Sequence, residues 1–213
     1  MGTRNLTMVI DQTGTLKVAQ YGQWDGYPAG QGSVVLEFAK NKEKMDRLKQ
    51  ALPNIKFFNK CKDIDKYIEE YNSRSPYWNE AELKTMPDNR TETDFYWFEK
   101  TQTRDLCAKI LDSIITLDRT KLPKEHHTII YLYDDSEFGK DSLFCEWAYC
   151  INFETNKLEC FKGFNTDETK QHPRFATVSN DYYGIVLIKE YDLDNLPSEE
   201  DFIKELEAYD NED

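Results

Sequence analysis

Apolar residues recur at every second position near the start of the chain, which is typical of a β-hairpin. Leu6, Met8 and Ile10 follow this spacing, and residues 12–15 (QTGT) have the composition of a turn. A second strand is predicted over 16–21. Because a tight turn joins neighbouring strands, we expect the two strands to pair in antiparallel fashion.

Helical periodicity begins after a glycine-rich loop that follows the hairpin. Ser33 is a natural N-cap, and Pro53 ends the pattern. The apolar positions at helical spacing between them are Val35, Phe38, Met45, Leu48 and Leu52. Two further helices are predicted, from residue 63 onward and over about 103–117, with a polar loop at 72–94 between them.

The second half of the chain is predicted to contain mainly strands. β-Branched and aromatic residues are concentrated at 128–133, 144–153, 158–164 and 183–189. The segment 154–157 (ETNK) is expected to be the turn of a second hairpin.

An acidic helix is predicted at about 198–209. Ser198 can cap it, and the acidic residues of its first turn suit the helix dipole. Phe202, Leu206 and Tyr209 fall on one face, which we expect to point inward with the acids outward.

This order of elements predicts an α+β fold with a largely antiparallel sheet and packed helices. A helix–sheet–sheet–helix sandwich is one layering that fits it. No composition shift marks a linker, so we expect residues 1–213 to form a single domain.

The charge of the chain is unevenly distributed. The net charge is −13, and residues 189–213 hold 11 acids and 2 bases. A net charge of only −4 is left for the other 188 residues. This balance argues against nucleic acid as a partner. The acidic end is either a solvated face or a surface for a basic partner.

The sequence predicts a cytoplasmic protein without metal or cofactor. No run of 18 apolar residues and no signal-peptide pattern is present, so no membrane association is expected. The five cysteines form no CxxC pair, which favours reduced thiols. Cys145 and Cys150 are expected on opposite faces of one strand. His126 and His127 are adjacent and would point apart, which disfavours a shared metal ion.

The most informative segment is the loop 21–32 (YGQWDGYPAGQG), which combines glycines, aromatics and one acid. Asp25 is a candidate to bind a ligand or to act as a general base, although it can also cap the turn. Trp24 and Tyr27 can stack on a planar ligand or pack under the loop. Arg4 can bind an anionic group or form a salt bridge with Asp25.

Gly30, Gly32 and Ser33 lead into the predicted helix. Backbone N–H groups at a helix start can bind an anion such as phosphate. Neither GxxxxGKS/T nor GxGxxG is present, so the indication of a nucleotide site is weak.

Several motifs resemble a family of uncharacterised bacterial and phage proteins, with more distant fungal relatives. The motifs lie at 2–7 (GTRNLT), 21–28 (YGQWDGYP), 30–32 (GQG), 146–149 (EWAY) and 158–163 (LECFKG). This resemblance implies no activity. The element order also resembles that of N-terminal-nucleophile hydrolases. Such an activity in this chain would require removal of two residues, so that Thr3 becomes the first residue with a free amine.

Two hypotheses follow from the sequence. The first is a non-enzymatic recognition protein that binds a macromolecular partner or a small polar ligand through loop 21–32, for example a phage-type inhibitor of a host protein. The second is an N-terminal-nucleophile-like hydrolase or amide-transferring enzyme centred on Thr3, Arg4, Asp25 and Tyr27. The aromatic run 95–98 is a further candidate for a partner surface or for core packing.

Overall fold

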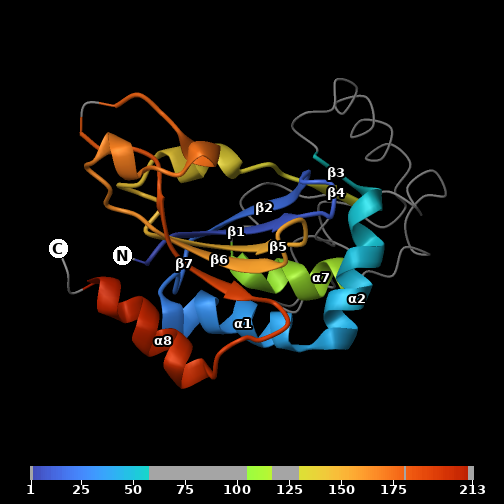
Figure 1. The fold of residues 1–213 in the computed structure, drawn as a ribbon. Helices are drawn as coiled ribbons and strands as arrows, with labels where there is room; N and C mark the ends of the chain where they lie inside the picture. The colour runs from blue at the N-terminus through green and yellow to red at the C-terminus, as the bar shows by residue number, and fades with distance from the viewer. Residues whose placement is uncertain (1, 58–104, 117–129, 180, 211–213) are drawn as a thin grey trace, which may run out of the picture.

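A five-stranded mixed sheet forms the centre of the computed structural model, which describes residues 2–57, 105–116, 130–179 and 181–210 (Figure 1). Its strands are β1 (Asn5–Ile10), β2 (Leu16–Gly22), β5 (Trp147–Asn152), β6 (Lys157–Lys162) and β7 (Val186–Asp192). The order is β2-β1-β5-β6-β7, and only the β1–β5 pair is parallel. The predicted α+β class with a largely antiparallel sheet is confirmed.

Both predicted hairpins are present, β1–β2 and β5–β6. The last strand begins at Val186 rather than at residue 183. The reason is that the preceding amides bond to loops and not to β6. Tyr183 N–H donates to the Asn165 carbonyl, and Ile185 N–H donates to the Gly139 carbonyl.

Four α-helices of the described chain cover one face of the sheet (Figure 1). They are α1 (Ser33–Lys40), α2 (Lys42–Ala51), α7 (Ile110–Thr116) and α8 (Glu199–Glu207). The single helix predicted over 33–52 is therefore two helices. Asn41 adopts an extended conformation between them, and its side chain accepts the Lys44 N–H to cap α2. The apolar face continues across the break, which is why the periodicity did not reveal it.

The opposite face of the sheet is covered by short 3₁₀ turns at 136–140, 168–170 and 173–175 (Figure 1). In the described part of the chain, a second sheet pairs β3 (Ile55–Phe57) in parallel with β4 (Ile130–Leu132). The helix–sheet–sheet–helix layering is thus not formed by the part of the chain that the structure describes. The predictions for 63–71, 72–94, 95–98 and the pair at 126–127 lie outside the described residues.

Each face of the sheet has its own apolar core. The core under the helices includes Val9, Trp147, Tyr149 and Phe202. The other core includes Met8, Phe161, Phe175 and both Cys145 and Cys150. The prediction that these two cysteines face opposite sides is wrong, because Cys145 precedes β5 and is not part of the strand. Cys107, Cys145, Cys150 and Cys160 are all buried, and no disulfide joins any of these four.

A partly buried ion pair connects the segment after β6 to the sheet. Arg174 Nη1 donates to Glu159 Oε2 at 2.7 Å, and Asn152 Nδ2 donates to Glu159 Oε1 at 2.6 Å. In the same layer, the His172 and Phe175 rings both pack edge to face or tilted against neighbouring rings, and the His172 ring meets the Phe161 ring edge to face. Burial is the main cause that lowers the pKa of His172, and Arg174 adds to it. Because loss of Arg174 would leave the buried Glu159 charge uncompensated, this pair makes the position of Arg174 against β6 costly to change.

Helix α8 is docked as predicted. Ser198 caps it by accepting the Asp201 N–H at 3.1 Å, and Phe202 and Leu206 are fully buried. Tyr209 is an exception, because it lies in a 3₁₀ turn after the helix and is 36% exposed. Within the described ranges, no helix has the length and apolar character to cross a membrane.

We expect Phe202→Ala to lower the free energy of unfolding by about 3–5 kcal/mol, because the ring is fully buried against Tyr149 and Tyr191. The exposed neighbour Glu200 provides a matched control, and Glu200→Ala should change the value by less than about 0.5 kcal/mol. Urea denaturation followed by circular dichroism measures both. Equal effects in the two variants would show that α8 is not docked through Phe202.

Candidate functional site

The loop 21–32 lies at the end of the sheet where the parallel strands β1 and β5 begin. The register places Asn5 of β1 opposite both Gly22 of β2 and Trp147 of β5. On the far side of β5, Trp147 faces Lys162, which in turn faces Val186. Residues from all five strands of this sheet are therefore gathered at one end.

Hydrogen bonds from the strands hold the loop backbone. Gly26 N–H donates to the Thr3 carbonyl at 2.9 Å, and the Tyr149 hydroxyl donates to the Gly26 carbonyl at 2.9 Å. The buried Asn5 amide donates to the Trp24 carbonyl at 3.2 Å. Since Asn5 and Tyr149 are fully buried, the loop is tied to the interior of the molecule and not only to its own residues.

Two glycines of the loop allow close backbone approach. A Cβ atom on Gly30 would lie 2.1 Å from the Asp25 carbonyl oxygen. One on Gly32 would lie 2.8 Å from the Tyr149 hydroxyl oxygen. At both positions a side chain would force the neighbouring atoms apart, so these glycines are required by packing.

The predicted anion site is not available in this geometry. Gly30 and Gly32 donate their N–H groups to the Tyr27 carbonyl, at 2.9 and 3.4 Å. The Ser33 N–H bonds to the Gly30 and Pro28 carbonyls. The prediction that Ser33 caps the helix is also wrong. Gly32 holds the N-cap position, and the Ser33 hydroxyl donates to the Pro28 carbonyl at 3.2 Å.

Arg4 has a different partner from the one predicted. Its Nε lies 3.4 Å from Glu146 Oε1, and its backbone N–H donates to the same oxygen at 3.1 Å. The guanidinium also lies over the Phe144 ring, 4.6 Å from the centroid. The predicted Arg4–Asp25 salt bridge is therefore wrong, because the parallel β1–β5 pairing brings Glu146 beside Arg4.

Asp25 lies on the surface in a left-handed conformation, with φ of 53°. Its backbone carbonyl accepts the Gln31 N–H at 2.8 Å. Its carboxylate has no hydrogen bond or ion pair within the described part of the chain, so the predicted turn-capping role is not observed there. A general base works best when it is desolvated, and an exposed carboxylate lacks that environment.

Three aromatic side chains form what we call the aromatic rim: Trp24, Tyr27 and Phe144. They are 47%, 41% and 44% exposed, so the two that belong to the loop do not pack beneath it. The Trp24 indole N–H donates to Asp105 Oδ1 at 3.1 Å. The backbone carbonyl of Arg4 lies beside Gly26, and the Arg4 guanidinium lies over the Phe144 ring.

The sequence did not identify Glu146, Phe144 or Tyr149 as parts of this site. The motif 146–149 contains Glu146 and Tyr149 and could have drawn attention to them. Their position beside the loop, however, depends on the pairing of β1 with β5, which brings together residues 142 positions apart in the sequence. Thr3 does lie next to the loop, through its carbonyl. No cluster of His, Cys, Asp or Glu suited to a metal ion is found in the described ranges.

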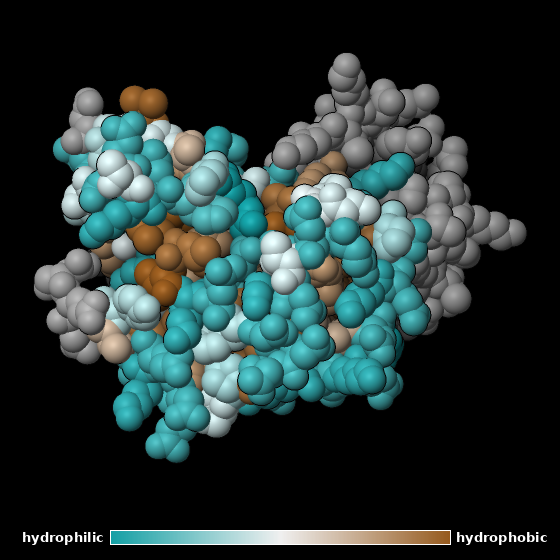
Figure 2. Space-filling view, in the orientation of Figure 1, coloured by the Kyte–Doolittle hydropathy of each residue, from teal (hydrophilic) through white to brown (hydrophobic). Residues whose placement is uncertain are grey.

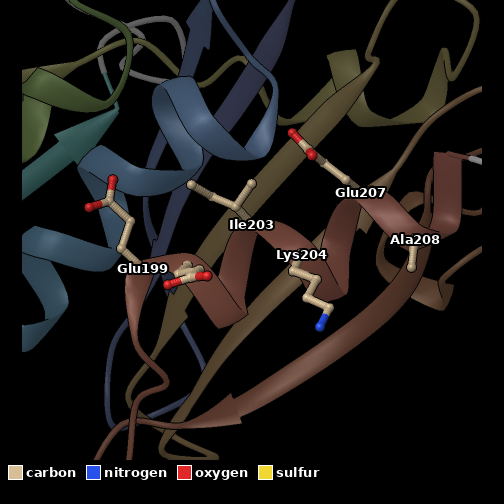
Figure 3. A pocket seen from close by; sticks show the side chains of 6 residues that line it. Glu199, Ile203, Lys204, Glu207 and Ala208 are labelled. Carbon is tan, nitrogen blue, oxygen red and sulfur yellow. The ribbon is translucent and has the colours of Figure 1, made fainter.

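The acidic helix carries an open hollow on its outer side. It has a volume of about 720 Å³ and is lined by Glu199, Glu200, Ile203, Lys204, Glu207 and Ala208. Figure 3 shows Ile203 pointing toward α1, with Lys204 and Ala208 pointing away from it. The acids of α8 are thus displayed on a fixed, docked surface, as the sequence predicted.

Comparisons of this chain with protein-family models, curated proteins and solved structures find no match. The resemblance drawn from the motifs therefore stays a hypothesis, and function has to be argued from the geometry.

We expect Asp25→Asn to change the free energy of unfolding by less than about 0.5 kcal/mol, because Asn tolerates the left-handed conformation and no described partner is lost. Asp25→Ala should lower it by about 1 kcal/mol, because the conformation disfavours a Cβ without a polar group. Thermal and urea denaturation measure the difference. If Asn were as destabilising as Ala, the carboxylate would have to make a stabilising contact.

Proposed function

We propose that this protein is a recognition protein that binds a protein partner through the aromatic rim and does not catalyse a reaction. The observation that supports the proposal is the exposure of Trp24, Tyr27 and Phe144, of which the first two lie on a loop held by hydrogen bonds from the buried Asn5 and Tyr149. Trp and Tyr are enriched at protein interfaces and among the residues that dominate binding energy.

The setting of the rim suits a binding surface. Its backbone is already ordered, so little conformational entropy would be lost when a partner binds. Charged groups accompany it, because the Arg4–Glu146 pair lies at Phe144 and the exposed Asp25 follows Trp24 in the loop. Apolar anchors with a polar surround are the usual anatomy of a protein interface.

The resemblance to phage proteins suggests a concrete form of this proposal, in which the partner is a host protein that the chain inhibits. The net charge of −13 would favour a basic partner by accelerating association at low salt. The alternative within the same hypothesis is that loop 21–32 binds a small polar ligand instead of a protein.

The hydrolase hypothesis has less support from the geometry. Arg4 is engaged by Glu146, and the Asp25 carboxylate is exposed. The enzyme would also require a chain that begins at Thr3. An intact mass that corresponds to loss of Met1 and Gly2 would favour it over binding alone.

Site-specific photo-cross-linking tests the proposal. A benzoylphenylalanine placed at Tyr27 should give one discrete adduct in an extract of the producing cells. The same group at Asp46, an exposed position on α2, should give none. Excess unlabelled protein should suppress the adduct, whereas excess Trp24→Ala protein should not.

The competitor variant needs a folding control. Trp24→Ala should keep the circular dichroism spectrum and a cooperative melting transition, since its ring is about half exposed. Equal adducts at both positions, or equal competition by the variant, would contradict a partner site at the rim.

A further inference from the structure

The last strand of the sheet has an outer edge that no described strand pairs with. β7 follows β6 at the end of the strand order, so only one of its edges is paired with another strand of the described ranges. Backbone N–H and C=O groups at such an edge can pair with an extended chain.

The two halves of β7 differ in how this edge is protected. Lys189, Glu190 and Asp192 bring charges to the second half, which is a common protection against unwanted pairing. The first half, Val186–Ile188, is apolar and only half-buried. A register shift between the Cys160–Lys189 and Phe161–Leu187 pairs leaves Ile188, the last residue of the apolar half, without a paired residue in β6. Figure 2 shows apolar surface open to solvent at the start of β7.

A groove of about 390 Å³ lies against this apolar half. Phe164, Leu187 and Tyr209 contribute to its apolar lining, and Lys162 and Lys170 contribute positive charge. Its volume is within the range that binds small ligands or a few side chains. The groove is distinct from the aromatic rim, although both are at the same end of the sheet.

Phe164 is held in the groove wall against its conformational preference. It has φ of 57°, a region that bulky residues rarely adopt, and its ring is 42% exposed. Its N–H donates to the carbonyl of the buried Ser142 at 2.8 Å. The Asn165 N–H donates to the Ser142 hydroxyl at 3.0 Å. Buried hydrogen bonds thus enforce a strained backbone that presents an aromatic ring to solvent, which points to a binding role.

The charge of the groove contrasts with that of the whole molecule. Lys162 and Lys170 outnumber Asp167, whereas the chain as a whole has a net charge of −13. The Asp167 carboxylate already accepts the N–H and the hydroxyl of Thr169, at 2.8 and 2.7 Å. A local excess of positive charge on an acidic molecule favours an acidic group in the groove.

We infer that the apolar half of β7 and this groove bind an extended acidic segment of a partner protein, which adds to Val186–Ile188 as a further strand. The backbone edge supplies the hydrogen bonds, Phe164 and Tyr209 receive an apolar side chain, and Lys170 attracts a carboxylate. The inference goes beyond the proposed function, because it concerns a second surface. A second copy of this chain fits less well, since two molecules of charge −13 repel each other.

Selection from a phage-displayed library of random linear peptides tests this inference. Peptides selected on the wild-type protein should combine an acidic residue with alternating apolar or β-branched residues. A synthetic peptide of the selected sequence should bind at least tenfold more weakly to Lys170→Glu. A peptide with lysine in place of its acidic residue should regain affinity for that variant.

Phe164→Gly separates binding from folding. Glycine accepts a φ of 57° freely, so this variant should melt at the same or a higher temperature while losing at least tenfold in peptide affinity. Trp24→Ala should bind the peptide like the wild type, which keeps this test independent of the aromatic rim. No enriched sequence, enrichment of basic peptides, full binding by Phe164→Gly, or concentration-dependent self-association in sedimentation velocity would overturn the inference.

Discussion

The hydrogen bond from the Tyr149 hydroxyl to the Gly26 carbonyl is the contact on which the candidate site depends. Tyr149 lies on β5, the central strand, and is fully buried. The same hydroxyl lies so close to Gly32 that a side chain there would collide with it. On the helical side, its ring packs against Phe202 of α8. One side chain therefore joins the sheet, the glycine-rich loop and the C-terminal helix.

This arrangement explains why the loop is rich in glycine and yet well ordered. Glycine costs conformational entropy when it is fixed, and that cost has to be offset by contacts. Here the contacts are buried hydrogen bonds from Tyr149 and Asn5. The gain is a surface on which Trp24 and Tyr27 are presented in a fixed position, so that a partner would not have to order them.

The sequence was sufficient for the local features and insufficient for the distant ones. The two hairpins and the capped helix with Phe202 follow from short-range patterns, and all three are present. The Arg4–Glu146 pair was missed because it requires the parallel pairing of β1 with β5, which no local pattern encodes. Phe144 and Tyr149 were missed for the same reason, because this pairing brings β5 and the residues before it to the loop.

Other differences have a physical cause that is visible only in three dimensions. The break between α1 and α2 at Asn41 leaves the apolar stripe intact, so the helical periodicity of the sequence predicted one helix and not two. The sequence predicted that the glycine N–H groups could bind an anion, but the N–H groups of Gly30 and Gly32 both donate to the Tyr27 carbonyl. Whether a donor is free depends on the path of the backbone, and a list of glycines does not give that path.

Amide hydrogen exchange in Tyr149→Phe tests the central claim most directly. Removal of the hydroxyl leaves the buried Gly26 carbonyl without its side-chain donor, which costs about 1–2 kcal/mol locally. The Gly26, Gly30 and Gln31 amides should then exchange about tenfold faster, while Val9 and Ile151 of the strands keep their protection. Unchanged exchange in the loop would contradict the account, because it would show that the loop is fixed without Tyr149.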